Sequence, residues 1–162
     1  MKALPVAMVS LFALLVAANN LLDYDSNFAF VQHVLSMDTT FDGNSLMWRA
    51  ITAPWVHHLA YLLIIVAEFI VALLCGLGAW RMLRGSHDLA RYWEGAMIAS
   101  WGLIAGIGLW FGGFMTVGAE WFLMWQSPTW NGQEAAFRFI MCLFACLIFI
   151  HLPERASPTD DE

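Results

Sequence analysis

Long apolar runs alternate with short polar segments along this chain. Four of the runs are long enough to cross a bilayer, at about 3–22, 54–83, 92–125 and 133–152. At ~1.5 Å per helical residue, about 20 residues match a hydrocarbon core of about 30 Å. In lipid, a single spanning segment satisfies its backbone polar groups only as a helix. The pattern therefore predicts an all-α integral membrane protein built as a four-transmembrane-helix bundle.

Local signals refine these runs. Pro54 suits a first helical turn, where its missing N–H costs nothing. The first run begins at Lys2 and has small residues before Asn19, as a signal peptide does. Because strongly hydrophobic sequence follows, we expect a retained span. The third run is longer than a bilayer requires, so we expect it to tilt or to kink at Gly112-Gly113.

The connection from 23 to 53 is predicted to be partly helical. Phe28, Val31 and Leu35 recur at helical spacing in it. The stretch SLMWRAI, at its end, is a candidate for a second short helix. Both segments are amphipathic, so we expect them to lie along the membrane surface or over the mouth of the bundle.

Basic residues predict the orientation. Five of the seven Lys and Arg flank one end of the predicted spans: Lys2, Arg81, Arg84, Arg91 and Arg155. The positive-inside rule makes that side cytoplasmic. Both termini are then inside, and the connection from 23 to 53 faces outward.

Composition agrees with lipid as the solvent. Hydrophobic residues make up 60% of the chain and charged residues 12%, whereas a soluble domain carries about 25% charged residues. Much of the net charge of −6 comes from the acidic segment 154–162, which we expect to be a disordered cytoplasmic tail after a transmembrane domain at 1–153. The sequence has no basic patch, so we expect no nucleic-acid partner.

Glu68 is the main candidate for chemistry. It is the one ionisable residue near the centre of the second run. A charged carboxylate inside a membrane costs about 2.5–3.5 kcal/mol on insertion scales, so such residues face a protein interior or water. One interpretation is a site for a proton or small cation. The other is a protonated carboxyl that hydrogen bonds to a neighbouring helix.

Further polar residues lie toward the outer ends of the runs. Asn19 and Asn20 are suited to hydrogen bonding between helices or to capping the outer connection. Arg138 has two candidate partners. Glu134 precedes it by four residues, which is favourable on a helix, and Glu120 lies at similar depth on the third run. A pair with Glu120 would join the third and fourth spans, whereas an unpaired Glu120 would mark an outer ligand vestibule.

Candidate metal ligands are few and scattered. His33, His57 and His58 are outer-side candidates, because imidazole suits zinc or copper. However, adjacent histidines point in different directions on a helix, and no HxxxH pattern occurs. No span has a His near its centre to ligate haem. The three cysteines lie in apolar runs and are interpreted as packing residues. We expect no cofactor, and no nucleophile or phosphate-loop motif indicates an enzyme.

Small and aromatic residues suggest structural roles. Small residues recur every two to four positions on the third run and let helix backbones approach closely: Gly95, Ala99, Gly102, Gly106, Gly108 and Gly112. Trp121, Trp125 and Trp130 near its outer end fit an interfacial aromatic belt.

The segments NFAFVQHVLSMDTTF, AEFIVALLCGLGAWRML and AEWFLMWQSPTWNGQEAAFRF resemble a bacterial family of predicted small integral membrane proteins, a domain of unknown function. The resemblance implies four spans and a bacterial inner membrane, and no known activity. Two hypotheses follow. In the first, the chain is a non-catalytic accessory, scaffolding or regulatory subunit that binds other membrane subunits or itself. In the second, it transports a small cation or proton through Glu68.

Overall fold

The computed structural model describes residues 2–153, so the acidic segment 154–162 lies outside the described residues. Within that range the chain is helical and contains no strand. Its α-helices are α1 (Ala3–Leu22), α2 (Tyr24–Ser36), α3 (Pro54–Arg84), α4 (Leu89–Ile107) and α5 (Gln133–His151). The π-helix η2 (Gly108–Trp121) continues α4, and the single-turn 3₁₀ helices are η1 (Met47–Arg49) and η3 (Met124–Gln126).

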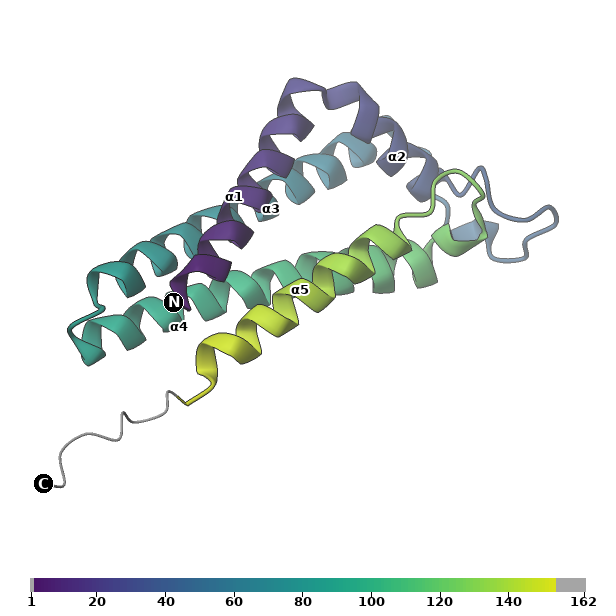
Figure 1. Cartoon of the computed structure of the whole chain (residues 1–162). Helices are drawn as coiled ribbons and strands as arrows, with labels where there is room; N and C mark the ends of the chain where they lie inside the picture. The colour runs from purple at the N-terminus through teal and green to yellow at the C-terminus, as the bar shows by residue number, and fades with distance from the viewer. Residues whose placement is uncertain (1, 154–162) are drawn as a thin grey trace, which may run out of the picture.

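Four helical segments are long and apolar enough to cross a membrane: α1, α3, the continuous helix formed by α4 and η2, and α5. The predicted all-α membrane architecture with four candidate spanning helices is therefore confirmed. The spans divide into two arms. Figure 1 shows a first arm, formed by α1 and α3, diverging from a second arm, formed by α4, η2 and α5. The arms join at the turn between α3 and α4, and α2 lies at their open end.

Glycines explain the close packing of α3 on α4. A Cβ added to Gly95 would lie 2.6 Å from the backbone nitrogen of Met82, and one added to Gly78 would lie 2.6 Å from that of Ala99. No side chain fits at such distances, so both positions need glycine for the backbones to approach. The small face of α4 is thus used inside the molecule.

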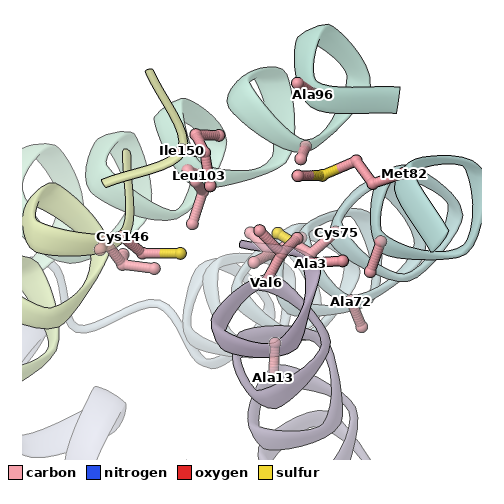
Figure 2. Close-up of a cluster of buried hydrophobic side chains, with 14 of the residues drawn as sticks. Ala3, Val6, Ala13, Ala72, Cys75, Met82, Ala96, Leu103, Cys146 and Ile150 are labelled. Carbon is pink, nitrogen blue, oxygen red and sulfur yellow. The ribbon is translucent and has the colours of Figure 1, made fainter. Parts of the chain in front are cut away.

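The main core lies where all four spanning helices meet. Its buried side chains are mostly small or flexible, and the close-up in Figure 2 shows Ala3, Val6 and Cys75 gathered between α1 and α3. Leu103 of α4 and Cys146 of α5 extend the same cluster toward the second arm. This apolar core fixes the end of the bundle that holds the α3–α4 turn, and it leaves the opposite end open.

The third span differs from its predicted bounds of 92–125. It begins at Leu89 because the Asp88 side chain accepts hydrogen bonds from the backbone N–H groups of Ala90 and Arg91. It ends at Trp121, because Leu123 has a positive φ of 55°, which a right-handed helix cannot continue. The structure has the π-helix η2 at the place where a kink at Gly112-Gly113 was expected.

The connection from 23 to 53, called here the outer connection after its predicted side, packs on both arms, through α2 on α3 and through Val34 and Met37 on the end of η2. Met37, which ends α2 with a φ of 53°, is buried together with Val34, Phe122 and Met124. In the SLMWRAI stretch only Met47–Arg49 is helical, as one 3₁₀ turn. The connection therefore closes over the outer end of η2.

Candidate functional site

A hydrogen-bonded chain of polar side chains centres on Glu68. The amide nitrogen Nδ2 of Asn20 donates to Oε2 of Glu68 at 2.8 Å. Nδ2 of Asn27 donates to Oδ1 of Asn20 at 2.7 Å, and the Tyr61 hydroxyl donates to the Asn20 backbone carbonyl at 3.1 Å. These four residues, here called the Glu68 cluster, come from α1, α2 and α3.

Helix geometry brings the cluster together. A Cα–Cβ bond points toward the N-terminus of its helix, so Glu68 on α3 points back toward the outer end of antiparallel α1. The hydroxyl of Ser10 sets the register of the two helices by donating to the Ala72 carbonyl at 2.7 Å. The Glu68 carboxylate therefore lies at the level of Asn20, two residues before the end of α1. It is nearer to the outer end of the bundle than its central place on α3 suggests.

Three residues of the cluster are buried, and Asn27 lies at its exposed edge. The exposed fraction is 3% for Glu68, 6% for Asn20 and 1% for Tyr61. Glu68 forms one side-chain hydrogen bond, through Oε2, within residues 2–153. No ion pair reaches it in that part of the chain. Burying a carboxylate away from water is costly unless it is paired, hydrogen-bonded or protonated, so Oε1 is the atom of the cluster that is open to a proton, a water molecule or a ligand.

The cluster lines a cavity of about 290 Å³ between the two arms. Asn20, Asn27, Tyr61 and Glu68 form its polar wall, and Trp110 and Phe114 of η2 face them among other apolar residues. No Lys or Arg is among the lining residues of this cavity in the described chain. The cavity therefore has a negative or neutral polar side and an apolar side.

A second hollow lies nearer the other end of α1. It is an apolar groove of about 760 Å³ between α1 and α5, with Met8 and Val9 on one side and Cys142 and Phe149 on the other. Trp110 lines both this groove and the Glu68 cavity. The gap between the arms therefore has a polar part and an apolar part that share one wall.

The outer ion pair is local to α5. Nη2 of Arg138 lies 3.1 Å from Oε2 of Glu134, and both side chains are exposed. Glu120 is exposed on η2, and the structure gives it no ion pair within residues 2–153. The structure thus brings Arg138 to Glu134 and not to Glu120, so the clasp between the third and fourth spans is not formed. Glu120 lines neither the Glu68 cavity nor the apolar groove, and the outer vestibule stays a prediction.

Sequence comparison assigns a family. The sequence model of a family described as predicted small integral membrane protein (DUF2165) matches residues 1–153. The chain belongs to this family. Its function is unknown, and no curated protein or solved structure matches the sequence. The resemblance of the quoted segments is thereby confirmed, and the geometry has to carry the functional argument.

The three outer histidines of this family member do not converge. His33 contacts the Asp38 carboxylate at 2.8 Å, and His57 Nε2 lies 2.7 Å from the Ile51 carbonyl oxygen. His58 Nδ1 lies 2.9 Å from the Tyr24 hydroxyl. Residues 2–153 contain no group of three or more His, Cys, Asp or Glu that could hold a metal ion. Each histidine thus joins elements of the outer connection.

Tyr24 lies outside the spanning segments and contacts α3. Partial burial, and to a smaller degree the neighbouring Asp25 carboxylate, raise the pKa of its phenol. The phenol therefore stays protonated at neutral pH and can donate to His58. This contact helps hold α2 against the first arm.

The three tryptophans predicted to form an interfacial belt pack on the outer connection. The Trp130 ring stacks on His33 with centroids 4.6 Å apart, and Trp125 meets Phe41 edge to face at 5.7 Å. Trp121 lies under the Arg49 guanidinium, which is 4.5 Å from its ring centroid. Each indole therefore has a specific partner within the chain.

The sequence alone did not identify Asn27 and Tyr61 as members of the Glu68 cluster, or Arg49 as the partner of Trp121. Tyr61 precedes Glu68 by seven residues, which places both on one face of a helix, and this spacing could have found it. Asn27 follows Asn20 by seven residues, but the turn at Asp23 separates their helices. Only the tertiary structure shows that Asn27 returns to the cluster.

Proposed function

We propose that the protein is a non-catalytic accessory subunit of the bacterial inner membrane, which scaffolds or regulates a larger complex or assembles with itself. The main support is an unoccupied small-residue surface on η2. A Cβ added at Gly108 or Gly112 would meet no heavy atom within 4 Å. In contrast, atoms of α3 occupy the space beside Gly95 and Gly102.

This open surface has the properties of a helix-docking face. Small residues let a second backbone approach in lipid. The large side chains of Trp101, Ile104 and Phe111, on the same continuous helix, are exposed and can pack beside such a partner. The face belongs to a 14-residue π-helical segment, and π-helical turns are frequent at functional sites.

Orientation follows from charge. Lys2, Arg81, Arg84 and Arg91 flank the ends of α1, α3 and α4 that meet at the α3–α4 turn. The ammonium of Lys2 also donates to the Leu152 carbonyl, which brings the ends of α1 and α5 together. Under the positive-inside rule this end is cytoplasmic. We therefore propose that both termini lie in the cytoplasm and that α2 lies outside.

The test is isolation of the protein from native membranes in mild detergent, followed by native mass spectrometry. We expect a stoichiometric complex with another membrane subunit or with a second copy. Joint replacement Gly108→Leu and Gly112→Leu should dissociate it. The control Val66→Phe adds bulk at an exposed position of α3 and should leave it intact. A lone monomer from native membranes would contradict the proposal.

A second function is favoured by one observation, the buried carboxylate facing a cavity. We propose it as the alternative: movement of a proton or small cation with Glu68 as the binding group. The apolar core between the cavity and the cytoplasmic end means that a continuous path would need an oligomer. The test is flux in proteoliposomes, where Glu68→Gln should abolish transport and Glu134→Gln, on the exposed surface, should not. Absence of flux in the wild type would exclude this alternative.

A further inference from the structure

The gap between the arms has the form of a site for one lipid. Its outer part is the cavity lined by the Glu68 cluster, and its inner part is the apolar groove between α1 and α5. Along α1, the groove ends at Ala13 and the cavity begins at Val16, one helical turn further. Pockets for small molecules usually have this character, with apolar walls and a few placed polar groups.

Depth favours a lipid head at the Glu68 cluster. The 20 residues of α1 match the thickness of a hydrocarbon core. Asn20 is two residues from the outer end of α1, or about 3 Å along the axis. Lipid head groups begin at this level. The groove from Ala13 to Pro5 then runs alongside the acyl region.

The polar wall defines the head group. The Glu68 side chain is more than nine-tenths buried. Its Oε1 has no hydrogen-bond partner within residues 2–153. Asn27 at the mouth offers a further amide oxygen. No Lys or Arg among the lining residues can neutralise a phosphate, and the carboxylate repels an anion. The complementary head is therefore uncharged and donates hydrogen bonds through hydroxyl groups.

The apolar wall accepts a chain. Ala145 and Cys142 of α5 are exposed and small, and face Met8 and Val9 of α1 across the groove. The arms touch within the groove where the Phe12 and Phe139 rings meet, with centroids 3.9 Å apart. An acyl chain is flexible enough to pass such a ring pair, whereas a helix of about 10 Å diameter needs the arms to separate.

We propose that the gap between α1 and α5 binds one uncharged, hydroxyl-bearing glycerolipid, with its head at the Glu68 cluster and an acyl chain in the groove. This inference goes beyond the subunit role, because it uses a surface different from the Gly108-Gly112 face. The two proposals can therefore fail independently.

The experiment is native mass spectrometry of the purified full chain with an equimolar mixture of dioleoylglycerol and dioleoylphosphatidylglycerol. We expect one dioleoylglycerol to be retained in preference to the anionic lipid. The preference should be roughly tenfold, which corresponds to about 1.4 kcal/mol. Asn27→Ala should reduce it, and Glu68→Gln should weaken the discrimination against the anionic lipid while the chain remains folded.

Groove variants control for nonspecific lipid. Ala145→Trp fills the groove from an exposed position and should remove the retained lipid, whereas Val66→Trp on the outer surface of α3 should not. Circular dichroism checks that each variant is folded. Equal retention of both lipids, or retention unchanged by Ala145→Trp, would overturn the proposal. Crosslinking of Cys142 to another protein in native membranes, with no lipid retained, would also overturn the proposal. That outcome would place a partner helix in the gap.

Discussion

Asn20 joins three helices through one side chain and its own carbonyl. Its amide donates to Glu68 and accepts from Asn27, while its backbone carbonyl accepts from Tyr61. All three hydrogen bonds lie between helices, and those to Glu68 and Tyr61 are buried, where water does not replace them readily. Asn20 is therefore the residue on which the geometry of the Glu68 cluster depends.

Asn20→Ala should lower the free energy of unfolding by about 1–3 kcal/mol, because it leaves a buried Glu68 and an Asn27 amide without their partner. The measurement is reversible denaturation in mixed micelles. Asn19→Ala is the matched control, since Asn19 is the same residue type on an exposed face of the same helix. Equal destabilisation by both substitutions would contradict the assigned role of Asn20.

At the residue scale, the sequence identified Glu68 and Asn20 separately but not their contact. Glu68 is conspicuous because a carboxylate in an apolar run is costly, and Asn20 because amides are rare there. Their pairing depends on the register of α1 against α3, which Ser10 and the packed small residues set. The contact of Arg138 with Glu134, in contrast, can be predicted from the sequence, because the two residues are four apart on one helix.

At the element scale, α3 and α4 are held together by backbone proximity. Adding a methyl at Gly95 would force α4 away from Met82, since the nearest backbone atom lies 2.6 Å from the new Cβ. The same change at Gly108 meets open space. The two positions lie on the same continuous helix but have opposite surroundings.

Gly95→Ala should therefore destabilise the protein by about 1–3 kcal/mol, the usual cost of overpacking. Gly108→Ala should leave stability unchanged or raise it by up to about 1 kcal/mol, because alanine favours a helix over glycine. Thermal unfolding in one detergent compares the two variants directly. A larger loss at Gly108 than at Gly95 would show that α3 does not pack on α4 as described.

Periodicity places the small residues on two opposite faces of the helix but does not say which face packs inside the chain. Gly95, Ala99, Gly102 and Gly106 form an internal face, while Gly108 and Gly112 are left outside. The difference follows from helical spacing, because Gly108 lies two residues, or about 200°, beyond Gly106 and therefore on the opposite side of the helix. The local sequence signals neither the π geometry of η2 nor the positive φ of Leu123 that ends the span.

At the scale of the whole molecule, the chain is two helical pairs joined at one end. The four spanning segments follow from hydropathy, because lipid demands long apolar helices. The divergence of the two arms does not follow from hydropathy, because it depends on which pairs of helices have small residues facing each other. The gap between the arms is therefore a feature that only the three-dimensional structure shows.

The orientation can be tested with reporter fusions. A green fluorescent protein fused after the last residue should fluoresce, and an alkaline phosphatase fused there should be inactive, because both termini are proposed to be cytoplasmic. The same reporters inserted after Asp42, in the exposed outer connection, should give the reverse pattern. Matching signals from the two positions would contradict the proposed arrangement.

The claim that the gap between α1 and α5 opens onto Glu68 is tested most directly by covalent labelling. A hydrophobic carbodiimide, which reacts with protonated carboxyls, is added to the protein in lipid nanodiscs at mildly acidic pH. The modified residue is then mapped by peptide mass spectrometry. Glu68 should be labelled, and Ala135→Trp at the wall of the cavity should block the labelling. Failure to label Glu68, or equal labelling in the Ala135→Trp variant, would contradict the account.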